Sequence, residues 1–75
     1  MATASRLSAL PAVETLLRHP ALSRSLQAIP RVLVLEAVRA ELAAERTRLR
    51  AGGPPSAADH LAERAAARAE AGWKP

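Results

Sequence analysis

The chain has 75 residues and no cysteine, and its eleven basic residues against seven acidic ones give a formal net charge of +4. This length allows one small domain, and the lack of cysteine excludes disulfides and a thiolate metal site. No stretch approaches the ~20 apolar residues of a membrane span, and no apolar run near the start is long enough for a signal peptide. We therefore expect a soluble, cytoplasmic protein. A short mitochondrial transit peptide in residues 1–10 is the weaker alternative.

The composition is dominated by nineteen alanines and eleven leucines, whereas there are only four valines and one isoleucine. Because Ala and Leu are strong helix formers, this mixture predicts an all-α fold whose helices pack closely through small residues. The basic balance favours nucleic acid, an anionic membrane or an acidic partner. However, ten of the eleven basic residues are Arg, which codon bias in a GC-rich genome would also produce. The charge alone leaves the partner open.

Prolines organise the first two thirds of the chain. Residues 1–9 are small and polar, and we expect a flexible N-terminus. Residues 10–51 form the predicted helical domain, with short helices over 11–19 and 20–29 and a long helix over 30–50, because proline ends one helix and suits the first turn of the next. Apolar residues recur at helical spacing in all three. The expected core is Leu16, Leu17, Leu22, Leu26, Ile29, Leu35, Val38 and Leu42.

The long helix combines a buried stripe with a row of arginines. At about 100° per residue, the stripe comprises Val34, Leu35, Val38, Leu42 and Leu49. Beside it, Arg39, Arg46 and Arg50 lie within roughly 40° of one another along roughly 16 Å of helix. This pattern predicts a small helical module that offers a basic face to a partner.

A break over residues 52–55, with two glycines and two prolines, separates the long helix from residues 56–75. Ser56 is the expected N-cap of a last helix, and Gly72 the residue just past its end. Leu61 is the one large apolar residue in this helix, and the other apolar residues are alanines. We therefore expect it to be loosely docked or to act as a linker, with Trp73 either closing the core or marking its end.

The residue pattern contains no recognisable catalytic or metal-binding arrangement. His19 and His60 are far apart and have no further ligands at suitable spacing, and the carboxylates are expected on exposed faces. The serines lack a partner base. Gly52 and Gly53 precede two prolines, so they cannot form a phosphate-binding loop that leads into a helix. We expect no enzyme activity, catalytic residue, metal or cofactor in this chain.

Nucleic-acid binding is the hypothesis that the arginines favour. Arg39, Arg46 and Arg50, with Arg18 and Arg31 on neighbouring helices, could follow a phosphate backbone. Because the chain has a single aromatic residue, recognition is expected through backbone and shape rather than through stacked bases. In the alternative, these arginines are a solvated face, partly paired with the glutamates of the same helix.

Two further functional classes remain open. In a helical protein-interaction module without a nucleic-acid role, the stripe from Val34 to Leu49 or the last helix would dock onto a partner. A helix-turn-helix DNA-binding domain is less favoured, because prolines stand where that motif needs a tight turn, often with glycine.

The order and spacing of several short motifs point to a known family. The motifs are LPAVE at 10–14, LLR at 16–18, VLE at 34–36, Val38-Arg39, Leu42, Arg46, Leu49-Arg50, a glycine turn at Gly52 and Lys74-Pro75. Together they resemble the N-terminal part of bacterial selenocysteine synthase, the L-seryl-tRNA(Sec) selenium transferase. The resemblance covers nearly the whole chain, although each motif is short and built from common residues.

The resemblance implies a tRNA-binding domain that recognises the elbow of selenocysteine tRNA, chiefly its long D-arm. In the family, residues equivalent to 56–75 lead into a pyridoxal phosphate domain. That domain, in a homodecamer, converts seryl-tRNA(Sec) to selenocysteinyl-tRNA(Sec) with selenophosphate. The family's Asn-x-Thr-Gly signature and Schiff-base lysine would lie beyond Pro75, and Lys74 is not that lysine. Arg39, Arg46 and Arg50 match basic positions of the family and are the expected tRNA contacts. We expect this chain by itself to be a monomer.

Overall fold

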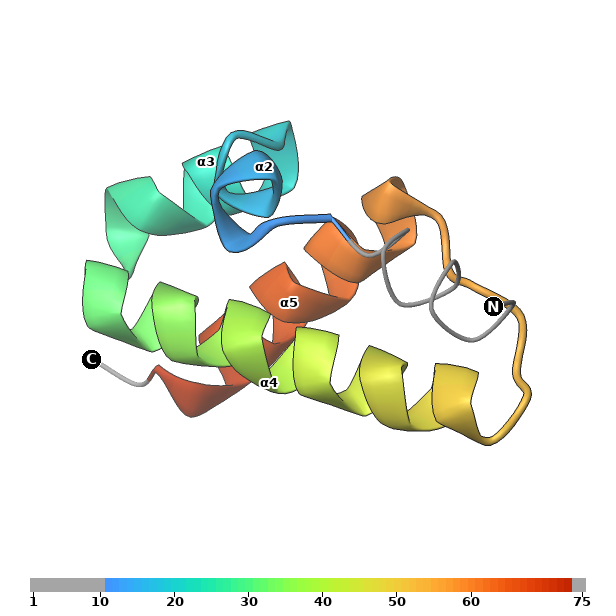
Figure 1. Cartoon of the computed structure of the whole chain (residues 1–75). Coiled ribbons are helices and arrows are strands. Elements are labelled where there is room, and N and C mark those ends of the chain that lie inside the picture. The colour runs from blue at the N-terminus through green and yellow to red at the C-terminus, as the bar shows by residue number, and fades with distance from the viewer. Residues whose placement is uncertain (1–10, 74–75) are drawn as a thin grey trace.

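The computed structural model describes residues 11–73, which form an all-α fold (Figure 1). The helices are α2 (Val13–Leu17), α3 (Pro20–Ala28), α4 (Arg31–Arg50) and α5 (Ala58–Gly72), and residues 11–73 contain no strand. The predicted fold class is therefore confirmed. The flexible N-terminus expected over residues 1–9 and the Lys74-Pro75 step lie outside the described residues.

The prolines begin the helices nearly where the sequence predicts. Pro20 is the first residue of α3, and His19 caps this helix because its Nδ1 accepts a hydrogen bond from the N–H of Ala21 at 3.1 Å. Pro30 lies one residue before α4, and its carbonyl accepts the first hydrogen bonds of that helix. The helix predicted over 11–19 is shorter, since α2 covers Val13–Leu17 alone. Pro11, Pro20 and Pro30 follow one another at intervals of nine and ten residues, which leaves room for only short helices between them.

A glycine turn ends α4 and returns the chain toward α5. Gly52 has a φ of 94°, a left-handed conformation that glycine adopts without steric cost. The N–H of Gly53 donates to the carbonyl of Arg48 at 2.9 Å, and a Cβ on Gly53 would lie 3.1 Å from that oxygen. The turn therefore favours glycine at both positions, by its φ at Gly52 and by the close approach to Arg48 at Gly53, and the predicted glycine break after the long helix is confirmed.

Both predicted ends of the last helix are wrong. Ala57, not Ser56, occupies the N-cap position of α5, and no side chain caps it. The backbone and hydroxyl of Ser56 instead contact Glu45 of α4. At the other end, Gly72 is the last helical residue and Trp73 is the C-cap.

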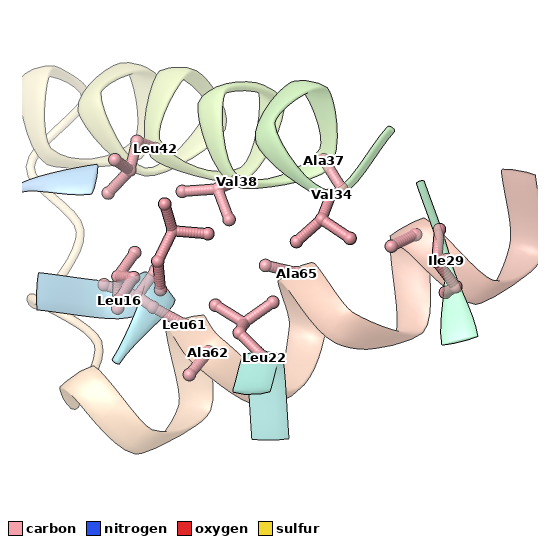
Figure 2. Packing of buried hydrophobic residues seen from close by; sticks show 12 residues of the cluster. Leu16, Leu22, Ile29, Val34, Ala37, Val38, Leu42, Leu61, Ala62 and Ala65 are labelled. Carbon is pink, nitrogen blue, oxygen red and sulfur yellow. The ribbon is translucent and has the colours of Figure 1, made fainter. Parts of the chain in front are cut away.

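The core lies where α2 and α3 cross the pair formed by α4 and α5 (Figures 1 and 2). Figure 2 shows Val34, Val38 and Leu42 of α4 opposite residues of α5, with Leu16 and Leu22 entering from the shorter helices. Of the expected core residues, Leu26 and Leu35 are only partly buried at its edge. The other six are buried: Leu16, Leu17, Leu22, Ile29, Val38 and Leu42.

Helix α5 is an integral part of this core, so the prediction of a loosely docked helix is wrong. Its most extensive packing is against α4, and it also packs on α2 and α3. Leu61, Ala62 and Ala65 are 0% exposed, and Ala69 is 3% exposed. The alanine methyl groups let two helix backbones approach closely, so a helix with one leucine still buries a complete face. Trp73 is partly buried against the same core.

Candidate nucleic-acid interface

The three arginines predicted as a row, Arg39, Arg46 and Arg50, are exposed on α4. None of them takes part in a salt bridge within residues 11–73. We refer to these three residues as the arginine row. Their guanidinium groups are therefore free to contact an anionic ligand.

The arginine row lacks acidic partners because the nearby glutamates of α4 are used elsewhere. Glu41 and Glu45 are 6% and 1% exposed. They pair with Arg48 of the same helix and with two arginines of α5. Glu36 is exposed and forms no salt bridge in the described part of the chain. The alternative in which glutamates of α4 neutralise the row is therefore not what the structure shows.

The expectation that the carboxylates lie on exposed faces is wrong for Glu45. This carboxylate accepts hydrogen bonds from the backbone N–H of Ser56 at 2.7 Å and from its hydroxyl at 3.0 Å. Arg48 donates to it from Nη2 at 2.7 Å, and Arg64 of α5 lies 3.5 Å away. The same Arg48 Nη2 also donates to the carbonyl of Pro54 at 3.0 Å. Glu45 thereby ties the end of α4 to the chain segment that enters α5.

Glu41, one turn earlier, joins α4 to the middle of α5. Its Oε1 accepts from Nε of Arg64 at 2.7 Å, and its Oε2 accepts from Nε and Nη2 of Arg68 at 3.2 and 3.1 Å. Among the described residues that are not exposed, no buried side-chain nitrogen or oxygen lacks a hydrogen-bond partner. We refer to Glu41, Glu45, Arg48, Arg64 and Arg68 as the clamp, and we assign it a structural role.

The environment of Glu45 changes its acidity. Burial raises the pKa of this carboxyl, but the hydrogen bonds from Ser56 and Arg48, with the positive charge of Arg48, outweigh it and hold the pKa below its usual value. Glu45 therefore stays ionised at neutral pH. The signal for this burial was present in the sequence, because Glu41 and Glu45 follow Val34 by seven and eleven residues and so fall on its stripe.

The structure brings together the two remaining predicted arginines, Arg18 and Arg31. They line a hollow of about 330 Å³ with Glu14, Leu17 and Leu26, where α2, α3 and the start of α4 meet. Both arginines are exposed, and neither forms a salt bridge within the described residues. We refer to this site as the hollow.

A larger groove of about 610 Å³ lies between α3 and α5. Alanines from both helices line much of it, together with Arg24, Glu63, Glu70 and Trp73. The single aromatic residue of the chain is therefore at this groove, which no residue of the arginine row lines. Its mixed charge gives no preference for an anionic ligand.

The histidines have structural positions. His19 caps α3 through Nδ1, and its Nε2 lies 2.9 Å from Oδ1 of Asp59 at the start of α5. Since Nδ1 accepts a hydrogen bond, Nε2 carries the proton that it donates to Asp59. His60 is exposed. No group of three potential metal ligands occurs within residues 11–73.

The described residues offer nothing to which pyridoxal phosphate could attach. That cofactor requires a lysine for its Schiff base, and residues 11–73 contain no lysine. We therefore place no Schiff base with this cofactor in this part of the chain. None of its helices is long and apolar enough to cross a membrane.

Comparison with known proteins identifies the family. The model of the selenocysteine synthase N-terminal family matches residues 7–46, which are 40 of the 75 residues. The match includes α2, α3 and most of α4, with Arg18, Arg31, Arg39 and Arg46. No curated protein and no solved structure matches the chain. The chain belongs to the selenocysteine synthase N-terminal family, the N-terminal part of a selenium transferase, and this membership gives it a role in selenocysteine biosynthesis.

Proposed function

We propose that this domain binds selenocysteine tRNA by its shape, with the arginine row placed along the phosphates of the D-arm and elbow. The observation that carries the proposal is the exposed row without salt bridges to the described residues, on a helix whose buried glutamates pair elsewhere. Guanidinium groups form strong, often bidentate hydrogen bonds with phosphate. Family membership supports a partner from selenocysteine biosynthesis.

The structure gives less support to a protein-interaction module. Of the stripe that would dock onto a partner, Val34, Val38, Leu42 and Leu49 are 0 to 5% exposed. The alanines of α5 cover much of the same core. The stripe and the buried alanines of α5 are therefore not free to bind a partner unless the domain unfolds. A charged ligand at the arginine row is the better explanation.

We further propose that the domain acts as part of a larger enzyme. In this proposal, residues 56–75 lead to a pyridoxal phosphate domain that converts seryl-tRNA(Sec) to selenocysteinyl-tRNA(Sec). Several copies in one oligomer would raise the apparent affinity through effective concentration. The separate domain is then expected to bind tRNA more weakly than the oligomer does. Its binding should therefore be measured at low salt, where phosphate contacts are strongest.

The test is a titration with selenocysteine tRNA at several salt concentrations. Replacing Arg39, Arg46 and Arg50 together by alanine keeps strong helix formers at all three positions. If each arginine contacts a phosphate, the variant binds more weakly and its log–log salt slope is smaller by about two units, at roughly 0.7–0.9 per contact.

A charge-matched control separates local contacts from net charge. Ser23→Glu, Gln27→Glu and Ala67→Glu together change the charge by the same three units, at exposed positions of α3 and α5. This control should keep most of the affinity and the wild-type slope. If the two triple variants lose affinity equally, the arginine row is not the binding site. Serine tRNA and duplex DNA as competitors measure specificity.

A further inference from the structure

The hollow has a size and shape suited to a small group. Its volume of about 330 Å³ lies at the lower end of the range for small-molecule pockets, about 300–1,000 Å³. It is assembled from three helices, with Glu14 and Leu17 from α2, Leu26 from α3 and Arg31 from α4. A peptide helix, about 10 Å across, is too large for it.

The chemistry of the hollow suits a nucleotide. Leu17 and Leu26, buried and partly buried, provide an apolar surface, and Arg18 and Arg31 provide two cationic groups. With one carboxylate, Glu14, the three ionised side chains have a net charge of +1. An apolar surface beside guanidinium groups can hold a base and its phosphate together, because guanidinium planes stack on bases and also bind phosphate.

The spacing of residues on α4 connects the hollow with the arginine row. Arg31, Leu35 and Arg39 are spaced four residues apart, so they form one ridge along the surface of α4. Arg46 and Arg50 continue on the same side. A strand whose phosphates follow the row toward the start of α4 therefore arrives at the hollow.

From this placement, we propose that the hollow holds one unpaired nucleotide of the bound RNA, with its base against Leu17 and Leu26 and its phosphate on Arg18 and Arg31. The inference rests on the proposed function and adds a base contact to the recognition of shape. The base must be unpaired, because a base within a helical stem has its faces covered by its neighbours. The elbow of a folded tRNA, where loops meet, supplies nucleotides of this kind.

The test compares two RNA hairpins with the same stem and the same number of phosphates. One has a loop of normal nucleotides, and in the other the loop nucleotides are abasic. We expect the wild-type chain to bind the normal hairpin about tenfold more tightly, since a guanidinium group against the face of a base contributes about 0.5–2 kcal/mol, equivalent to roughly 2- to 30-fold. Equal affinity for the two hairpins would overturn the inference.

Two variants assign the preference to the hollow. Leu26→Gln replaces the apolar side chain by a polar amide of similar length, and we expect its preference for the normal loop to fall below about twofold. Because Leu26 is partly buried, this variant could fold poorly, so the surface double variant Arg18→Ala/Arg31→Ala is measured beside it. Its charge-matched control is Arg24→Ala/Gln27→Glu on the exposed part of α3. The control should keep the tenfold preference, and a preference retained by the double variant would place the base elsewhere.

The outcomes separate this inference from the proposed function. If both hairpins bind equally and alanine at the arginine row still weakens them, the hollow is excluded while phosphate binding by the row stands. If neither hairpin nor selenocysteine tRNA binds at low salt, the proposed function fails, and the inference fails with it.

Discussion

At Glu45, one carboxylate accepts hydrogen bonds from Arg48 on its own helix and from Ser56 across the turn, with Arg64 of α5 close by. A buried charge with this many partners contributes little net stability when the whole group is compared with an apolar alternative. Removing one member is different, because it leaves the others without partners. The consequence is greatest at Glu45, which is 1% exposed, while Arg48 and Arg64 keep about half of their side chains in solvent.

We predict that Glu45→Gln lowers the free energy of unfolding by about 1–3 kcal/mol. The amide has one acceptor oxygen where the carboxylate has two, so either the Ser56 N–H or the Arg48 guanidinium loses its acceptor, and the charge that Arg48 pairs with is lost. The loss is smaller than for a fully buried ion pair, because solvent screens the charges of the half-exposed arginines. Urea denaturation followed by circular dichroism measures the change. Glu36→Gln, at an exposed position of the same helix, should stay within about 0.5 kcal/mol, and equal effects of the two would remove the structural role of the clamp.

The lowered pKa of Glu45 predicts how stability depends on pH. The folded pKa lies below the ordinary value of 4.5, so the unfolded chain binds a proton more readily. The stabilising contribution of ionised Glu45 is fully present above the pKa of this group in the unfolded chain. It is lost as the pH falls through the pKa of Glu45 in the folded chain. Urea midpoints measured between pH 7 and pH 3 should fall less steeply in Glu45→Gln than in the wild type. Parallel pH curves for the two proteins would contradict the assigned cause.

At the scale of the helices, alanines replace large residues on the buried side of α5. Ala62 and Ala65 are 0% exposed, and Ala62 lies beside Leu22 of α3 in Figure 2, whereas Ala67 of the same helix is exposed. Because the interior is close-packed, the space for each buried methyl group is fixed by the helix separation. Alanine therefore sets how closely α4 and α5 approach.

We predict that Ala62→Leu destabilises the domain by about 1–3 kcal/mol, because the added carbons must displace Leu22 or other core side chains. Ala67→Leu introduces the same group at a solvent-exposed position and should change the free energy of unfolding by no more than about 0.5 kcal/mol. Thermal melts of both variants and the wild type give the comparison. A tolerated Ala62→Leu would indicate that α5 adjusts freely against the helices packed on it.

The contrast between α4 and α5 explains which parts of the fold the sequence predicted. Prolines and apolar spacing correctly predicted four helices and a core around Val38. The docking of α5 was missed because the prediction counted only its single leucine as core-forming. The alanines Ala62, Ala65 and Ala69 recur with helical spacing and form the rest of the buried face. The burial of Glu41 and Glu45 was missed because a charge on an apolar stripe is acceptable only if another helix supplies its partners.

The candidate site shows the same division. The sequence predicts Arg39, Arg46 and Arg50 as a row, because three residues on one helix need only the helical repeat. It does not predict that Arg18 and Arg31 line one hollow. That placement depends on how α2 and α4 meet, which is determined by the packing of the whole domain.

At the scale of the whole molecule, the long helix α4 separates two kinds of charged residue. On one side, the clamp fixes α5 and uses the acidic groups Glu41 and Glu45. On the other, the arginine row forms no salt bridge within residues 11–73. Stability and the proposed RNA binding therefore depend on different arginines of one small domain, and substitutions at the row should leave the fold intact.

The integral position of α5 predicts that the domain unfolds in a single transition. Trp73, the only tryptophan in the chain, follows α5 directly and packs partly against the core, so its fluorescence reports the end of that helix. Circular dichroism at 222 nm reports all the helices together. If α5 belongs to the cooperative unit, the two signals give the same melting temperature and the same urea midpoint. A Trp73 transition that precedes the loss of helix would mean that α5 separates first, as a linker helix would. In that case Ala62→Leu should separate the two signals further, because it weakens the packing of α5 on the rest of the core.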